Sequence, residues 1–372
     1  MKARTRAHAV GSFGPGAMLA VLALGLLVSS ARTPTTPGSP PSSSDARIGS
    51  DPTSAGVEAG HVVLDMSSIV WDLAYDEERD VLWFAETSVG GADTLYSVDV
   101  NDETIHRYEL PETDYTGVVT QVKVGPDGVV WVTEPYRLVR FDPDTAEMTS
   151  TPVPLDDADR IEATVEPGTW ISAIAAIDGG VVVARNNVPR LDWYSTEMIP
   201  VRHIFIDHAY AGAWDLHAAS DRIMLLTGAG RDDQLVVLAA NGAVITAEQA
   251  SAERIRAYGN QIILSGSSDG AATVSSDGRV QSFPESVANA LAAVDPRGGV
   301  IVYRPDTGAI QRFTDGSPGR ALQLPTVTLY PRGGSQGSIS QPARVAALAV
   351  DRYGQVWFVQ QDDASLHVAT LP

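Results

Sequence analysis

A short pattern that recurs along the chain constrains the fold more than any other feature of the sequence. Residues 73–86 read LAYDEERDVLWFAE, residues 122–134 read VKVGPDGVVWVTE, and residues 348–360 read LAVDRYGQVWFVQ. Each copy has an apolar run, a tight turn rich in Gly and Asp, and a second apolar run with an aromatic residue at a fixed place. The unit predicts two antiparallel strands joined by a turn, and its recurrence predicts a radial repeat of such sheets.

Alignment of the turn extends this pattern to seven copies. The turns fall at residues 76–80, 125–128, 178–180, 220–222, 259–260, 295–299 and 351–354. The runs that follow them are strand-length and rich in β-branched residues, and no long helical periodicity separates them. The sequence therefore predicts an all-β fold: a seven-bladed β-propeller of four-stranded antiparallel sheets.

The two ends of the repeat region predict how the ring closes. The seventh copy reaches residue 372 with room for three strands, whereas His61–Met66 (HVVLDM) is an apolar run with no partner of its own. If this run forms the outer strand of the last blade, two sheet edges that would otherwise be open are paired. We therefore expect the propeller to span residues 61–372, with its N-terminal strand completing the last blade.

The residues before this domain have a different composition. Three basic residues and no acid precede an apolar run at Ala17–Val28. That run is shorter than the roughly 20 residues that cross a bilayer, and small residues that a signal peptidase accepts follow it. We interpret residues 1–31 as a signal peptide, with an uncleaved membrane anchor as the alternative. The Pro-, Ser-, Thr- and Gly-rich residues 32–60 are expected to be a disordered tether.

Composition and net charge limit the cellular compartment and the kinds of partner that are expected. The net charge of −20 repels phosphate backbones and anionic headgroups, so nucleic acid is not expected as a partner. A membrane would be contacted only through the N-terminal segment, if that segment is uncleaved. The chain has no cysteine, so packing alone must hold an exported domain. We expect an extracytoplasmic protein, secreted or anchored to the outer face of the membrane.

The copies with the aromatic residue resemble the repeats of the streptogramin (virginiamycin B) lyase-like propellers, in a pattern that NHL-type propellers share. The matching stretches are RDVLWFAE (79–86), GPDGVVWVTE (125–134) and YGQVWFVQ (353–360). The resemblance implies a histidine facing the central channel five residues before the turn, together with Mg²⁺-binding acids. The equivalent positions of this chain are Trp71, Thr120, Ala173, Asp215, Arg254, Ala290 and Ala346, so the catalytic histidines are not matched.

Two groups of residues are candidates for a ligand site at this channel. Asp215 and Arg254 occupy equivalent positions of adjacent blades and are expected to face each other, either to orient a polar ligand or simply to satisfy one another. Glu86, Glu134 and Gln360 end the second strands of three neighbouring blades. They either form an oxygen-rich cluster for Mg²⁺ or Ca²⁺, or each is solvated or paired with a nearby arginine.

A third candidate is the stretch RHIFIDHAYAGAWDLH at residues 202–217, with three histidines. Its spacing matches no standard zinc motif, so no metal is assigned to it. His208 and His217 are ligand-binding candidates there, and Trp71 is a further one at the channel. By contrast, Trp83, Trp131 and Trp357 stand at repeat-equivalent strand positions and are expected to pack between blades.

These features predict a binding module of the cell envelope or extracellular space, which binds its ligand over the central channel. The polar loops between second and third strands suit a small ligand, a carbohydrate, a peptide or an envelope protein. The alternative is a divergent Mg-dependent C–O lyase that opens a cyclic depsipeptide lactone, with His208 or His217 as base. A third hypothesis is a purely structural envelope domain. No cofactor is certain, and no catalytic residue is assigned.

Overall fold

The computed structural model describes residues 60–68, 70–87, 93–111, 119–153, 170–186, 188–206, 212–219, 222–228, 233–266, 270–275, 278–283, 288–329 and 339–371. The expected signal segment at 1–31 and nearly all of the expected tether at 32–60 lie outside these residues. Every regular element in the described ranges is a strand. Accordingly, no helix that could cross a membrane is found in them.

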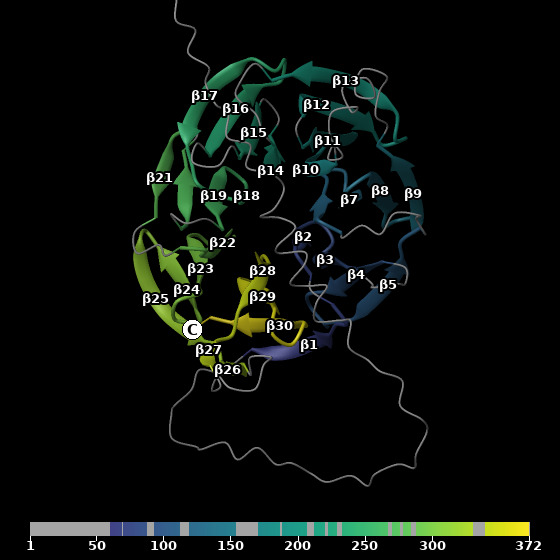
Figure 1. The fold of residues 1–372 in the computed structure, drawn as a ribbon. Coiled ribbons are helices and arrows are strands. Elements are labelled where there is room, and N and C mark those ends of the chain that lie inside the picture. The colour runs from purple at the N-terminus through teal and green to yellow at the C-terminus, as the bar shows by residue number, and fades with distance from the viewer. Residues whose placement is uncertain are drawn as a thin grey trace, which may run out of the picture. The chain divides into compact units, whose positions relative to one another are not determined.

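Seven four-stranded antiparallel sheets surround a common axis, with their first strands innermost and their fourth strands at the rim (Figure 1). Blades one to three are β2–β5 (Ala74–Asp76, Val81–Glu86, Thr94–Asp99, Ile105–Glu109), β6–β9 (Gln121–Val124, Val130–Glu134, Arg137–Asp142, Glu147–Pro152) and β10–β13 (Ile171–Ile177, Gly180–Arg185, Val188–Ser195, Pro200–Phe205). Blades four to six are β14–β17 (Ala213–Ala218, Arg222–Thr227, Gln234–Ala239, Val244–Gln249), β18–β21 (Arg254–Tyr258, Gln261–Ser265, Ala272–Val274, Val280–Ser282) and β22–β25 (Leu291–Val294, Val300–Arg304, Ala309–Thr314, Ser317–Gln323). The predicted seven-bladed propeller is thus confirmed.

The last blade combines the two ends of the domain. Its strands β28 (Val345–Val350), β29 (Gln355–Gln360) and β30 (Ser365–Thr370) are followed in space by β1 (His61–Asp65). β1 pairs antiparallel with β30, with His61 opposite Val368 and Asp65 opposite Ser365. The predicted closure by the N-terminal strand is confirmed, and the ring is joined by backbone hydrogen bonds between residues about 300 positions apart.

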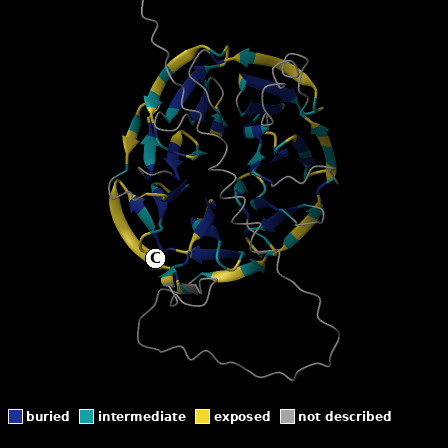
Figure 2. Ribbon diagram, viewed as in Figure 1, coloured by how far each residue is buried: buried dark blue, intermediate teal, exposed yellow. Residues whose placement is uncertain are grey.

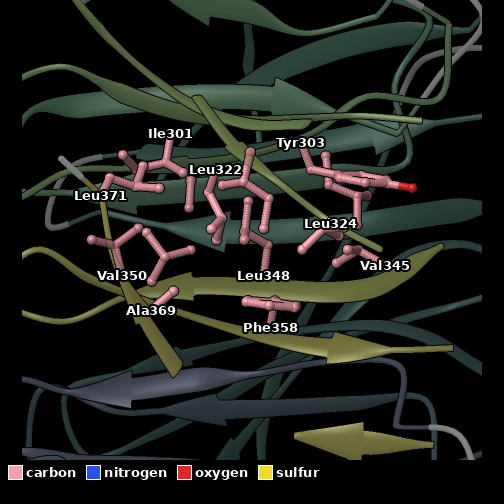
Figure 3. Close-up of a cluster of buried hydrophobic side chains, with 14 of the residues drawn as sticks. Ile301, Tyr303, Leu322, Leu324, Val345, Leu348, Val350, Phe358, Ala369 and Leu371 are labelled. Atoms are coloured by element: carbon pink, nitrogen blue, oxygen red, sulfur yellow. The ribbon is translucent and has the colours of Figure 1, made fainter. Parts of the chain in front are cut away.

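The core lies between the blades rather than at the centre of the ring. Seven clusters of buried apolar side chains form, and each combines residues from two consecutive blades. Figure 3 shows the cluster between blades six and seven. Burial follows the same plan, because second and third strands are buried on both faces and fourth strands are exposed (Figure 2). Trp83, Trp131 and Trp357 lie in three of these clusters and are at most 2% exposed, as predicted.

The turns between first and second strands also connect neighbouring blades. Gly128 has a φ of 72°, the left-handed backbone conformation that a tight reversal requires. Turn arginines reach the next blade in three places: Arg79 to the carbonyl of Gly128, Arg297 to the carbonyl of Gly354, and Arg352 to the Asp80 carboxylate. Contacts between the turns of neighbouring blades are therefore polar, whereas contacts between their sheets are apolar.

The structure departs from the sequence prediction in two respects. A hairpin that was not predicted, β26 (Thr326–Leu329) with β27 (Ile339–Pro342), stands between blades six and seven. The first strands of blades one and two are also shorter than expected, because β2 begins at Ala74 rather than Ile69 and β6 at Gln121 rather than Val118.

Candidate functional site

Strand pairing identifies which residues of the first strands are equivalent around the channel. Each second strand has one equivalent position, occupied in turn by Trp83, Trp131, Val182, Met224, Ile263, Val302 and Trp357. The first-strand residues that pair with it form the turn row: Ala74, Lys123, Ala175, His217, Arg256, Ala292 and Ala349. The residues two positions earlier form the loop row: Asp72, Gln121, Ala173, Asp215, Arg254, Ala290 and Ala347. Polar side chains occupy these rows only in blades one, two, four and five. The other three blades have alanine at both positions.

This register corrects the sequence alignment by one residue in blades one, two and seven. The alignment placed Trp71 and Thr120 in the loop row, whereas the structure places Asp72 and Gln121 there. Trp71 is half-buried beside the row, and the Thr120 hydroxyl bonds instead to that of Thr133 at 2.9 Å. The error arises because the turns between first and second strands differ in length, from two residues between Ile177 and Gly180 to five between Val124 and Val130, so counting back from the start of a turn does not give the register.

Four of these polar residues form a buried ion cluster in the channel. Lys123 Nζ lies 3.1 Å from Asp215 Oδ1 and 3.6 Å from Asp72 Oδ2. Arg256 donates to Asp72 and, at 3.3 Å, to Asp215 Oδ2. Asp215 is 1% exposed, so its charge depends on these partners. Arg256 and Lys123, together with a backbone hydrogen bond, lower the pKa of the Asp72 carboxyl against the opposing effect of its burial.

Three residues of the loop row also join their blade to the next one through the free inner edge of the ring. Asp72 accepts a hydrogen bond from the Val122 amide at 3.2 Å, and Asp215 accepts one from Ile255 at 2.8 Å. The Gln121 side-chain carbonyl does the same for the Ile174 amide, at 2.8 Å. These amides belong to strands whose inner edge has no partner strand, so the side chains satisfy donors that would otherwise be buried unpaired.

Arg254 occupies the same row but does not fulfil this role. We expected it to face Asp215, yet the arginine that bonds to Asp215 is Arg256, two residues further along β18. The Arg254 side chain makes no hydrogen bond or ion pair among the residues that the structure describes. Burial and the neighbouring Arg256 lower its pKa from the usual arginine value. It is thus a channel cation without a direct protein counter-ion.

A cavity of about 700 Å³ occupies the end of the channel at which the first strands run into their turns. Its walls combine polar groups with apolar side chains from the first strands of blades one to five, including Leu73, Val122, Ala175, Leu216 and Ala257. The turn row contributes Lys123 and His217, and turn residues Glu77, Glu78 and Arg352 surround the entrance. The cavity lies at the opposite end of the channel from the loops that were expected to bind a ligand.

His217 is a polar group of the cavity wall that is available to bind a ligand. Its imidazole makes no hydrogen bond among the described residues, although it is more than half buried. Burial, followed by the nearby Lys123 charge, lowers the pKa of His217 from 6.5, and Asp215 opposes the shift only in part. The ring is therefore neutral at pH 7, with one nitrogen able to donate and the other to accept.

Glu86 has a structural role in the closed ring. Its Oε1 accepts hydrogen bonds from the Ser67 amide and hydroxyl, both at 2.5 Å, and from the Ser68 amide at 2.8 Å. Its Oε2 accepts one from the Tyr96 hydroxyl at 2.9 Å. Ser67 and Ser68 connect the closing strand β1 to blade one, so the hydrogen bonds to Glu86 hold this connecting segment in place.

The other two members of the expected acidic group also bond within their own blades. Glu134 forms a two-point ion pair with Arg137, the pairing with a nearby arginine that was one of the two hypotheses. Gln360 donates to Asp363 at 3.0 Å. Within the described ranges, no three His, Asp or Glu side chains are grouped so that they could hold a metal ion.

The histidine-rich stretch is only partly placed. His208 lies outside the described residues, and His203 is exposed on β13, where its ring meets Phe205 edge to face. The alignment did not single out Asp72, Lys123 or Arg256. Their signal in the sequence is the pair of polar residues, two apart, in otherwise apolar first strands: Gln121 with Lys123, Asp215 with His217, and Arg254 with Arg256.

Fold and site together define a seven-bladed β-propeller with an asymmetric, partly charged channel. No protein-family model matches the sequence, and no curated protein does either. Among solved structures, a streptogramin B lyase is 13% identical, with a TM-score of 0.59 over 83% of this chain and 96% of that chain. A catalytically inactive virginiamycin B lyase from Staphylococcus aureus with quinupristin is 12% identical, with a TM-score of 0.58 over 83% and 98%.

The WD40 β-propeller domain of Doa1 is equally similar, at 11% identity and a TM-score of 0.58 over 85% of this chain and 97% of that one. The resemblance to streptogramin lyase-like propellers expected from the motifs is therefore confirmed in the fold. At these identities the likeness shows the fold alone, because unrelated functions share this architecture.

Proposed function

We propose that this propeller is a ligand-binding module whose channel takes up a small, uncharged polar molecule at the turn end. The observation that carries this proposal is the His217 imidazole, which is neutral and has no hydrogen-bond partner among the described residues, at the wall of a cavity of about 700 Å³. Small-molecule sites typically enclose about 300–1,000 Å³, with apolar walls and few polar groups. A sugar or an amide would bury its apolar face on these walls and exchange a hydrogen bond with His217.

The charges near the cavity favour a neutral ligand. Lys123 is already paired with Asp72 and Asp215. Both carboxylates are engaged in turn by Lys123, Arg256 and backbone amides. A charged ligand would have to break these buried pairs, which is costly because each partner would lose its counter-ion.

A divergent lyase is the second candidate, because a neutral imidazole facing a cavity can accept a proton. The described residues do not fit the Mg²⁺ that such an enzyme would need. Asp72 and Asp215 are held by cations and amides, and no three potential ligands converge. The lyase hypothesis therefore predicts Mg²⁺-dependent, EDTA-sensitive opening of a cyclic depsipeptide lactone by the purified chain, whereas the binding proposal predicts no turnover.

The binding proposal is tested with a panel of neutral mono- and disaccharides and N-acetylated amides, screened by saturation-transfer NMR. The variant Ala257→Phe fills the cavity, and Ala321→Phe places the same ring on the exposed surface of β25. A ligand of the cavity should bind Ala321→Phe normally and bind Ala257→Phe and His217→Ala at least about tenfold more weakly, the loss of roughly one good hydrogen bond. Equal affinity for Ala257→Phe, or lactone turnover, would overturn the proposal.

We also propose that this module works outside the cytoplasm. Support comes from the basic residues at the start of the sequence and the short apolar run at Ala17–Val28. N-terminal sequencing of the protein from culture medium and from membranes tests this. A mature N-terminus near Ala31 in the medium fits a secreted form, and an intact N-terminus in membranes fits an anchored form. Recovery of the intact chain only from cytosol would contradict export.

A further inference from the structure

The loop row of the channel contains a residue that its structural role does not explain. Three polar members of this row accept the amide hydrogen bond of the next blade: Asp72, Gln121 and Asp215. Arg254 stands in the same place in blade five but cannot do so, because a guanidinium has five donors and no acceptor. The equivalent amide of blade six, that of Leu291, therefore finds no hydrogen-bond acceptor on the Arg254 side chain. Selection for blade packing alone would not place a cation here.

The described charges of the ion cluster leave Arg254 without a counter-ion at contact distance. The two acids Asp72 and Asp215 share four close contacts with Lys123 and Arg256. Arg254 lies within electrostatic range of both acids but at ion-pair distance from neither. The next acid, Glu253, is exposed and forms no ion pair with Arg254, although its charge also favours the charged guanidinium. Among the described residues, the side chains of the two rows thus supply three cations and two anions, in a chain whose net charge is −20.

A half-buried cation with no counter-ion among the described residues is unfavourable, since it has lost part of its hydration without gaining a close counter-charge. We propose that Arg254 is an anion-binding residue that holds one carboxylate group of a small monoanion at the loop end of the channel. One negative charge would balance the cluster, and the planar fork of the guanidinium matches the two oxygens of a carboxylate.

This site is separate from the cavity of the proposed function. Arg254 begins β18 and precedes Arg256, whereas the cavity is lined by Ile255 and Ala257 and by the turn residues beyond them. The ion cluster lies between the two ends of the channel. The two proposals can therefore fail independently, because substitutions at His217 or Ala257 leave Arg254 in place.

The experiment measures the thermal unfolding midpoint of the full chain in sodium acetate and in sodium chloride at equal ionic strength. At 100 times its dissociation constant, a bound anion should raise the midpoint by about 5 °C in a domain of this size. We expect this rise in the wild type and in His217→Ala. We also expect it in Arg320→Gln, which removes a cation from an exposed position of β25.

The rise should be absent in Arg254→Gln and reduced in Arg254→Lys, which keeps the charge but not the planar fork. In chloride, Arg254→Gln should unfold no lower than the wild type, because the substitution removes an uncompensated charge. A full acetate response in Arg254→Gln would place the anion elsewhere. No response in the wild type, together with a lower midpoint for Arg254→Gln in chloride, would show that the arginine is structural. Inorganic phosphate serves as the comparison probe, and a response to phosphate but not acetate would refute the carboxylate assignment.

Discussion

The contacts of Glu86 predict that it stabilises the closure of the ring rather than binding a cation. The perturbation is Glu86→Ala, which removes the acceptor of three hydrogen bonds from Ser67 and Ser68 and one from Tyr96. A hydrogen bond to a charged group contributes about 1.5–3 kcal/mol, and less where water can replace it, as at the exposed Ser67. We therefore expect a loss of about 4 kcal/mol in the free energy of unfolding, and about half as much for Glu86→Gln.

The assay is denaturant unfolding combined with amide hydrogen exchange of β1. About 4 kcal/mol corresponds to almost a 10³-fold change in an equilibrium constant, so the β1 amides that pair with β30 should exchange faster by up to that factor. Glu147→Ala, at an exposed carboxylate that begins β9, is the control and should change neither quantity. Unchanged stability in Glu86→Ala, with Mg²⁺ or Ca²⁺ stabilising only the wild type, would refute the structural role and favour the cation cluster.

Three further predictions follow from the same contacts. Asp215→Ala should lower the free energy of unfolding by about 3 kcal/mol, because Lys123 and Arg256 each lose one of two carboxylate partners and the Ile255 amide loses its acceptor. Denaturant titration checks this, and a loss below about 1 kcal/mol would contradict it. Because the pKa of His217 is lowered in the fold, the unfolded chain binds a proton that the folded chain does not, and stability falls as the pH drops below about 6.5. His217→Gln should make this fall shallower in unfolding curves at pH 5 to 8, and an unchanged slope would show that other groups cause it. Deleting residues 1–59 should leave the unfolding midpoint unchanged, whereas deleting residues 1–66 removes β1 and should lower it; equal midpoints would mean that β1 does not stabilise the ring.

Periodic features of the sequence predicted most of the architecture. The turn and the aromatic position recur because each blade must reverse its chain and pack on its neighbour in the same way, so local signals report the global repeat. The pairing of His61–Asp65 with the last blade was predicted because an odd strand and a blade with three strands complement each other. The hairpin β26–β27 was not predicted, since it belongs to no repeat.

The site residues were predicted less accurately than the fold, because the alignment placed some of them one residue out of register. Asp215 and His217 were identified, but Asp72 was read as its neighbour Trp71. The turns differ in length from blade to blade, and an error of one residue in register exchanges the two faces of a strand. The expected partner of Asp215 was Arg254, and the observed one is Arg256. Two residues on one strand face the same way, so only their heights along the channel distinguish them.

Sequence alone determined the repeat, the number of blades and the strand that closes the ring, because these depend on contacts that recur at fixed spacing. Only the tertiary structure decided which charges meet. Asp72 and Arg256 are 184 positions apart, and their contact depends on how four blades are rotated about the axis. Which buried charges form pairs depends on distances of a few ångströms between side chains. The order of residues along the sequence does not encode such distances. For the same reason, the free imidazole of His217 and the unpaired guanidinium of Arg254 became evident only in the folded ring.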